Sequence, residues 1–257
     1  MTIGNSLASC NFNGNAVKSS FFLYRNVTSQ YNDTKTLDAV RKLVPDYMQE
    51  DSLESLLKWF KGFMHWMPAN LVCGNCNSGT NNAKDTGFMQ RKLEIGDSWK
   101  IPKTEVYTCN LCGAMQYFPR HNEVLKIGNS RIGRCGEWSI LFGAVLNSLS
   151  YQSRIVQDYL DHCWNEVIVD GRWVHVDSTL DYPTSLDHPH YYEKNWGKKY
   201  LYVLSFSSDQ VEDVTQRYTQ DWESVLLRRQ DLKETGSDTQ LGSISDLQNL
   251  YCSIKIS

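Results

Sequence analysis

The sequence predicts a mixed α+β fold that includes a metal-binding region, and three features support this prediction. Apolar side chains recur at helical spacing from Asp51 onward. The dipeptide Asp170-Gly171 separates two stretches of alternating apolar residues, a pattern typical of a β-hairpin. Between these features stand two C-x-x-C pairs, which begin at Cys73 and Cys109 and indicate a metal site.

The bulk composition is that of an ordinary globular protein. Of 257 residues, 41% are hydrophobic and 21% are charged, and this length is enough to bury a substantial core. The formal net charge of -3 favours neither a nucleic-acid partner nor a membrane surface. We also expect no membrane span, because no run of 18 or more apolar residues occurs, and no signal peptide, because the first residues are small and polar.

The predicted elements follow one another along the chain. Residues 1–32 are rich in Asn and Ser and carry one apolar patch at 21–24, which predicts loose structure with a short docking segment. The apolar positions between 53 and 64 predict an amphipathic helix whose stripe faces the core. Further along we expect short strands at 105–109 and 114–118, a helix at 139–149, a hairpin of 163–169 with 172–177, a strand at 200–206, and a helical region from 221 onward.

The two C-x-x-C pairs offer four thiolates to one metal ion. Each knuckle, Cys73 with Cys76 and Cys109 with Cys112, presents two sulfurs whose charge backbone N–H groups can support. Four thiolates complete a tetrahedral shell and leave no position for water, so such a site is structural. We predict a structural zinc ion, with redox-active dithiols as the alternative.

Cys135 is the candidate nucleophile. It stands just before the apolar helix expected at 139–149, and a helix N-terminus lowers the pKa of a thiol. Gly133 and Gly136 would allow a substrate to approach the backbone, where the N–H of Cys135 can stabilise an oxyanion. A lone Cys is more often a small buried apolar residue, so this assignment depends on the residues of the hairpin.

The register of the hairpin brings a His and an Asp together. If Asp170 and Gly171 form a two-residue turn, Trp164 faces Asp177 across the two strands. His162 then lies diagonally from Asp177 on the same face, about 7–8 Å away between alpha carbons, within reach of a hydrogen bond. Together with the upstream cysteine this predicts a Cys-His-Asp triad, in which His162 takes the thiol proton and Asp177 fixes the imidazole tautomer. The alternative for His162 is a hydrogen-bonded structural histidine.

Several separated blocks resemble the cytosolic peptide:N-glycanases, which are transglutaminase-like cysteine enzymes. These blocks are the two C-x-x-C pairs, Gly133-Arg134-Cys135-Gly136-Glu137-Trp138, Asp161-His162-x-Trp164-x-Glu166, Arg172-Trp173-Val174-His175-Val176-Asp177-Ser178 and Trp196-Gly197-Lys198-Lys199. The resemblance, to the short fungal-type form, implies a papain-like α+β core, a four-cysteine zinc-binding domain inserted in or appended to it, and a deep cleft between them. It divides the chain into an N-terminal, partly helical segment (1–50), a helix with the zinc region (51–125), the catalytic core (126–220) and a C-terminal helical segment (221–257).

The same resemblance implies an activity, which is hydrolysis of the β-aspartyl-glucosaminyl amide that joins an N-glycan to Asn of a denatured glycoprotein. By position, Cys135 would form a thioester, His162 would act as base and acid, and Asp177 would orient the imidazole. The residues implied as substrate-binding, either lining the cleft or supporting it, are Glu137, Trp138, Trp164, Glu166 and Trp173.

The resemblance also carries implications for the cellular setting. It implies glycoprotein quality control linked to ER-associated degradation, in the cytoplasm and also the nucleus, with a proteasome-shuttling ubiquitin receptor as adaptor. The chain departs from the family pattern at 157–160 and at Thr179-Leu180, both near the implied glycan cleft. Two rivals stay open: transglutaminase- or peptidase-type acyl transfer on the same fold, and a non-catalytic glycoprotein-binding adaptor.

Overall fold

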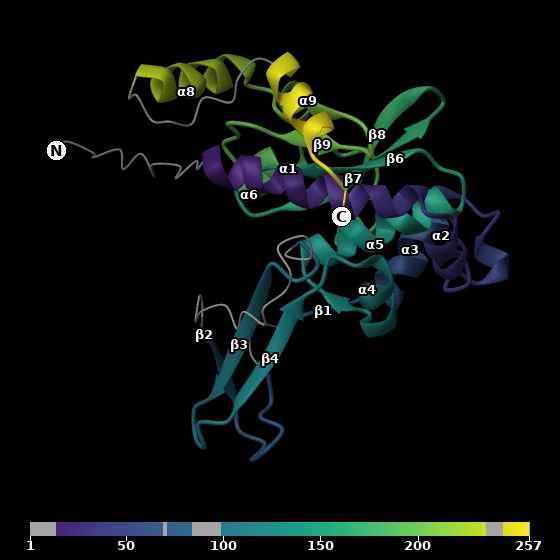
Figure 1. Ribbon diagram of the computed structural model, residues 1–257, viewed down its shortest axis with the longest axis vertical. Coiled ribbons are helices and arrows are strands. Elements are labelled where there is room, and N and C mark those ends of the chain that lie inside the picture. Colours follow the sequence, from purple (N-terminus) through teal and green to yellow (C-terminus); the bar gives the residue numbers. More distant parts are fainter. Residues whose placement is uncertain (1–13, 69–70, 84–98, 235–243, 257) are drawn as a thin grey trace.

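The computed structural model describes residues 14–68, 71–83, 99–234 and 244–256, and it consists of a body of helices and sheet with a projecting second sheet (Figure 1). The α-helices are α1 (Gly14–Ser29), α2 (Thr34–Arg41), α3 (Leu53–Phe63), α4 (Val124–Ser130), α5 (Cys135–Ser148), α6 (Tyr191–Trp196), α7 (Thr215–Tyr218), α8 (Trp222–Glu234) and α9 (Ile244–Ser253). The strands are β1 (His65–Trp66), β2 (Thr80–Ala83), β3 (Lys103–Cys109), β4 (Met115–Arg120), β5 (Ile132–Gly133), β6 (Ser153–Gln157), β7 (Cys163–Val169), β8 (Arg172–Val176), β9 (Leu204–Phe206) and β10 (Val211–Asp213). No helix in these ranges is both long and apolar enough to cross a membrane.

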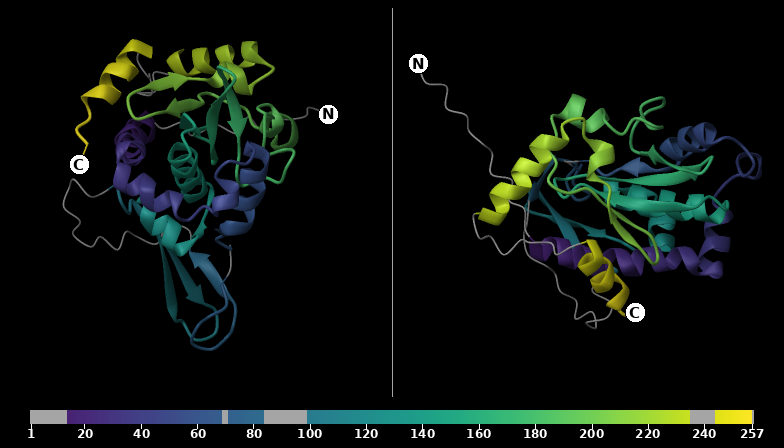
Figure 2. Two further views of the ribbon diagram at one scale, coloured as in Figure 1. Left: turned by 90° about the vertical axis from the view of Figure 1, so that its right-hand side faces the viewer. Right: turned by 90° about the horizontal axis from the view of Figure 1, so that it is seen from above.

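The body is built around α5, which is apolar on nearly every side. A helix of this kind needs cover all round, and α5 lies between α1 and α3, below the five-stranded sheet (Figure 2). That sheet has the order β10-β9-β6-β7-β8, with every neighbouring pair antiparallel. The helix 139–149 is therefore confirmed, and it begins one turn earlier than expected, at Cys135 itself.

The predicted hairpin is confirmed in its strands and its register. Val169 pairs with Arg172, and Glu166 with His175, as a two-residue turn requires. Asp170 and Gly171 have φ of 50° and 77°, the left-handed values that this turn type needs at both central positions. The register is thus fixed by the turn chemistry that the sequence displays.

The N-terminal region is the clearest correction to the sequence-based expectations. Loose structure was predicted over residues 1–32, but α1 runs from residue 14 to 29 and packs on the sheet. Val17, Phe21 and Tyr24 lie on one helical face and are buried, and the rings of Phe21 and Phe206 are 5.6 Å apart. The Asn and Ser residues around this stripe have low helix propensity, which led to the prediction of loose structure. Tertiary packing of the apolar face overcomes that preference. Residues 1–13 lie outside the described ranges.

Other expectations hold in part. The helix predicted from Asp51 is α3, capped by Ser52, and the strands predicted at 105–109 and 114–118 are β3 and β4. The strand predicted at 200–206 is shorter, since only residues 204–206 form β9. Two elements were not predicted from the sequence: β6, the strand at the centre of the sheet, and α6.

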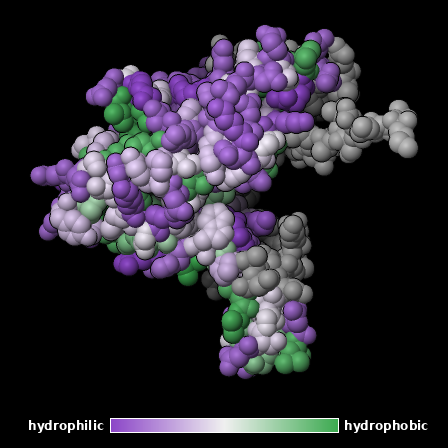
Figure 3. All heavy atoms as spheres, turned by 180° about the vertical axis from the view of Figure 1, so that it is seen from behind, coloured by the Kyte–Doolittle hydropathy of each residue, from purple (hydrophilic) through white to green (hydrophobic). Residues whose placement is uncertain are grey.

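The second sheet, of order β2-β3-β4, projects from the body as an antiparallel meander. Figure 3 shows it standing apart, with hydrophobic side chains near its tip, where Leu111 is 75% and Met115 is 58% exposed. Its base meets the N-terminal end of α5, which holds the candidate nucleophile.

Replacing Phe21 tests whether α1 is an integral part of the core. Phe21→Ala should lower the free energy of unfolding by about 3–5 kcal/mol, because it empties a fully buried aromatic site against Phe206 and Tyr251. Chemical denaturation measures the effect, and Ser19→Ala, at an exposed position of the same helix, is the control. A loss below about 1 kcal/mol would show that α1 is only loosely attached.

Candidate active site and metal centre

His162 and Asp177 meet at the open end of the hairpin. His162 Nε2 lies 2.7 Å from Asp177 Oδ2, and both side chains are buried. The other carboxylate oxygen accepts hydrogen bonds from the backbone N–H of Thr179 at 2.9 Å and from its hydroxyl at 2.7 Å. Burial acts to raise the pKa of Asp177, but the charge and hydrogen bond of His162 hold it well below its usual range. Asp177 is therefore ionised at neutral pH.

The ionised carboxylate fixes which imidazole nitrogen is basic. Asp177 can only accept, so His162 Nε2 carries a proton and donates it. Burial acts to lower the pKa of His162, but the charge of Asp177 raises it to about 10. Nδ1 is then the nitrogen left to exchange a proton with Cys135.

Cys135 is the first residue of α5, and its sulfur lies 3.7 Å from the carbonyl oxygen of Asp161, next to His162 in the chain. Its side chain is only partly buried. Hydrogen bonding with Cys163 lowers the pKa of Cys135 well below its usual range; burial opposes this, and the hydrogen bond and charge of His162 lower the pKa further. The resting site therefore favours a thiolate beside an imidazolium, the pair that nucleophilic cysteine chemistry requires.

A closed ring of charges anchors the start of α5 to the projecting sheet. Glu105 of β3 accepts from Arg134 at 2.7 and 2.8 Å and from Arg120 at 3.0 Å. Arg120 donates in turn to both oxygens of Glu137, at 2.6 and 2.8 Å, and Glu137 accepts the backbone N–H of Arg134 at 3.0 Å. The residue before Cys135 is thus held by β3 directly and by β4 through Glu137.

Gly133 is required by this ring. A Cβ built there would lie only 2.3 Å from the Cβ of Glu137, so any other residue would push Glu137 out of its place. The sequence-based reason for this glycine, access for a substrate, does not apply to it. At Gly136 an added Cβ would lie 3.5 Å from Arg120 Nη2, an ordinary contact.

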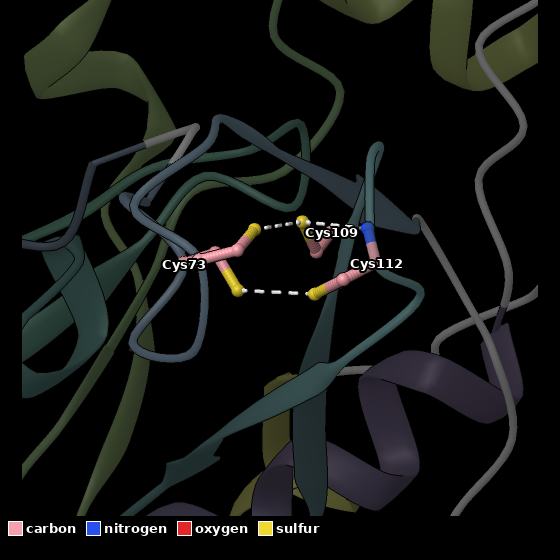
Figure 4. A group of neighbouring side chains, drawn as sticks. Cys73, Cys109 and Cys112 are labelled. Atoms are coloured by element: carbon pink, nitrogen blue, oxygen red, sulfur yellow. Dashed lines mark hydrogen bonds between the residues drawn. The ribbon is translucent and has the colours of Figure 1, made fainter.

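The four cysteines of the two knuckles converge at the far end of the projecting sheet (Figure 4). Their sulfurs all lie within 4.8 Å of one another, with Cys73 and Cys112 3.7 Å apart and Cys76 and Cys109 3.5 Å apart. Backbone N–H groups support the sulfurs as expected, for example that of Asn75 at 3.4 Å from Cys73. Four thiolates around one ion at about 2.3 Å would stand about 3.8 Å apart, so the group can hold a metal.

Two family models match the part of the chain that carries the candidate catalytic side chains. Residues 102–178, which include Cys135, His162 and Asp177, match the model of the transglutaminase-like superfamily, and residues 156–242 match the Rad4 transglutaminase-like domain. Residues 102–242 of the chain thus carry transglutaminase-like domain sequence. The predicted superfamily and α+β class are therefore confirmed.

Several curated relatives carry the name peptide-N(4)-(N-acetyl-beta-glucosaminyl)asparagine amidase. That of Rattus norvegicus is 39% identical over 71% of this chain and 27% of its own length. Those of Macaca fascicularis and Arabidopsis thaliana are 36% and 35% identical, over 84% and 77% of this chain and 33% and 30% of their lengths. The chain thus spans about a third of the length of the curated relatives it matches. A solved Rad4-Rad23 complex with a 6-4 photoproduct UV lesion has a TM-score of 0.48 and 13% identity, covering 92% of this chain and 56% of that chain.

Four of the five residues implied as substrate-binding are buried within this transglutaminase-like domain. Glu137 and Trp138 are each 2% exposed, Trp164 is 1% exposed, and Glu166 is 0% exposed. They present almost no surface to a ligand, so direct contact does not fit them and the supporting role does. Trp173 is half-buried and lies under the Arg154 guanidinium, 4.0 Å from its ring centre.

The contacts of Trp164 and Glu166 explain why these two side chains are buried. Trp164 stacks beside the His162 ring, with centroids 5.8 Å apart. Glu166 of β7 accepts from Arg154 of β6 at 2.6 Å and from Arg217 of α7 at 2.5 Å, so it joins two strands and a helix. His175 faces Glu166 across the strands, but its imidazole bonds the Tyr192 hydroxyl.

Two residues that were not predicted from the sequence, Asp158 and Lys198, hold the backbone that leads into His162. Asp158 is 1% exposed, and its Oδ1 accepts the backbone N–H groups of Leu160, Asp161 and His162 at 2.9, 3.1 and 2.9 Å. Lys198 donates to Asp158 and to Asp161. The available signal in the sequence was the block 196–199, which is part of the resemblance but had no role assigned to it.

The ring of charges generates a prediction about acid sensitivity. Burial acts to raise the pKa of Glu105, but the Arg134 hydrogen bond and the two guanidinium charges lower it to about 2. A carboxylate pKa below its unfolded value of about 4.3 stabilises the fold above that pH, and the contribution is lost as pH falls toward 2. Glu105→Gln should therefore cost about 1–3 kcal/mol at pH 7 and progressively less below about pH 4.

Denaturant unfolding at pH 7, 4 and 3 measures this difference. Glu54→Gln removes a carboxylate from an exposed ion pair with Lys58 and should change stability far less, so it serves as the matched control. An equal cost of Glu105→Gln at all three pH values would mean that its charge is not what stabilises the ring.

Proposed function

We propose that this chain hydrolyses the β-aspartyl-glucosaminyl amide that links an N-glycan to an Asn side chain of a denatured glycoprotein. The observation that carries the proposal is the 2.7 Å bond between His162 and Asp177 beside a nucleophile at a helix start, in a chain whose relatives are named as amidases of this bond. Their name gives the substrate class, and the geometry supplies the chemistry.

The first half of the reaction would form a thioester. The Cys135 thiolate attacks the side-chain carbonyl carbon, and the N–H groups at the start of α5 stabilise the oxyanion. The C–N bond then breaks, and imidazolium Nδ1 of His162 gives its proton to the departing glycosylamine. Asp177 holds the ring so that this nitrogen faces the reaction.

The second half would regenerate the thiolate. Neutral His162 takes a proton from water, the hydroxide adds to the thioester carbon, and the C–S bond breaks to release Asp in the peptide. The sulfur leaves as a thiolate beside the newly formed imidazolium. The released glycosylamine then loses ammonia in water without help from the protein.

Two exposed tryptophans flank this site and suit a carbohydrate. Trp196 is 45% exposed, and its ring lies 5.1 Å from that of His162. Trp66 is 49% exposed, and its strand pairs with Gly133, two residues before the nucleophile. Aromatic faces beside a reacting centre favour sugar rings, so we assign these two to the glycan in place of the buried tryptophans.

The decisive experiment is incubation with a denatured high-mannose glycopeptide, followed by mass spectrometry for Asn-to-Asp conversion. The wild type should convert it. Cys135→Ala and Asp177→Asn should each lose about 10⁴-fold in rate, since the nucleophile and the tautomer are lost respectively. Cys252→Ala, at an exposed cysteine of α9, is the control and should keep full rate.

Two results would contradict the proposal. Conversion by Cys135→Ala at a wild-type rate would exclude Cys135 as nucleophile. Ammonia release from glutamine peptides without deglycosylation would instead assign the transglutaminase-type chemistry to this triad.

We also propose that Cys73, Cys76, Cys109 and Cys112 hold a zinc ion with a structural role, since four thiolates leave no open coordination position. Such thiolates persist in reducing compartments, so the cytoplasm remains the proposed location. The adaptor stays a prediction of the sequence resemblance.

Elemental analysis of freshly purified protein should find one zinc per chain. Cys76→Ser should lower the zinc content and expose the projecting sheet to proteolysis, because metal binding energy is folding energy in such sites. Cys252→Ser controls for the loss of a thiol. Metal-free protein in which all four thiols react with a thiol reagent would contradict the assignment.

A further inference from the structure

Behind Asp177 lies a chain of hydrogen bonds that the proposed reaction has not used. The Tyr192 hydroxyl lies 2.7 Å from Asp177 Oδ2 and 2.7 Å from His175 Nε2. His175 Nδ1 in turn accepts the backbone N–H of His188 at 3.3 Å. Tyr192 and His175 are 0% and 1% exposed, so water does not compete for these bonds.

The direction of every proton in this chain is fixed. The His188 amide can only donate, so a neutral His175 carries its proton on Nε2 and donates it to the Tyr192 oxygen. The Tyr192 O–H is then left to donate to Asp177. Burial, with the charge of Asp177, raises the pKa of Tyr192 well above its usual range, and burial lowers the pKa of His175 to about 4. Both groups therefore stay neutral near pH 7.

Asp177 depends on these donors at one stage of the reaction. Within the described ranges its only ion-pair partner is His162, and no Lys or Arg pairs with it. When His162 has given its proton to the leaving group, the buried carboxylate has no counter-charge, a state that is costly unless hydrogen bonds hold the charge. Tyr192 and Thr179 then supply those hydrogen bonds.

We propose that Tyr192, oriented by His175, is a positioning residue that keeps Asp177 ionised while His162 is neutral, so that His162 can release its proton. Without the hydroxyl, the carboxylate would rely more on the imidazolium, and His162 would hold its proton more tightly. The resting thiolate–imidazolium pair would survive, but protonation of the leaving group would slow. The turnover consequence rests on the proposed function, whereas the consequence for His162 does not.

Tyr192→Phe removes the hydroxyl and keeps the ring. We expect kcat for deglycosylation to fall about tenfold with KM nearly unchanged, the effect of one hydrogen bond to a charged group. Alkylation of Cys135 by iodoacetamide at pH 7, followed on its own peptide by mass spectrometry, should keep its wild-type rate. Alkylation that falls in parallel with kcat would indicate a distorted site and overturn the proposal.

The substrate-free arm is the NMR titration of His162 in a Cys135→Ala background. Adding Tyr192→Phe should raise the midpoint by about one pH unit, and an unchanged midpoint would overturn the proposal even if turnover falls. If the wild type does not deglycosylate, this titration still decides the role of Tyr192.

Two further variants separate the relay from packing. His175→Gln keeps an N–H donor near the Nε2 position and should retain most of the wild-type kcat and His162 midpoint, whereas His175→Met should resemble Tyr192→Phe. Tyr191→Phe removes a neighbouring hydroxyl of α6 that makes no hydrogen bond in the described ranges, and it should leave both readouts unchanged. Equal loss in His175→Gln and His175→Met would exclude the donor role of His175.

Discussion

The turn at Asp170 and Gly171 is the constraint on which the site depends. Its two left-handed residues set the pairing of β7 with β8, and a slip of one residue would move every side chain to the other face. In the observed register the apolar face packs on α5, and the other face holds His162 and Asp177 in a hydrogen bond. Core packing and catalytic geometry therefore require the same register, so neither can shift alone.

The second constraint is the ring formed by Glu105, Arg120, Arg134 and Glu137. It joins the projecting sheet to the first turn of α5, so the nucleophile is positioned from one side by the metal-binding region and from the other by the hairpin. Removing one partner from a mostly buried ring leaves an unpaired charge, which costs more than the pair contributes. This explains why the charges alternate around a closed path with each carboxylate bonded more than once.

The site is layered outward from Asp177. His162 lies on the side of Cys135, while Tyr192 and His175 lie behind the carboxylate. Trp164 packs beside the rings of His162 and Tyr192. The residues nearest the reaction come from a helix start and the open end of the hairpin, and their supports come from the hairpin strands β7 and β8 and from α6. A buried carboxylate with four hydrogen-bond donors and one titrating counter-charge is suited to a partner that gains and loses a proton in each cycle.

The sequence by itself determined the features that rest on local chemistry. Turn residues fixed the hairpin and hence the His162–Asp177 pair, the C-x-x-C spacing fixed the knuckles, and the apolar run fixed α5 with Cys135 at its start. Only the tertiary structure decided what depends on contacts between distant segments. It made α1, expected to be loose, part of the core, and it buried Trp138 and Trp164, which the resemblance had implied as lining the cleft or supporting it. It also brought Tyr192 to Asp177, 15 residues away in the chain, because hydrogen-bond partners across a loop leave no periodic signal in a single sequence.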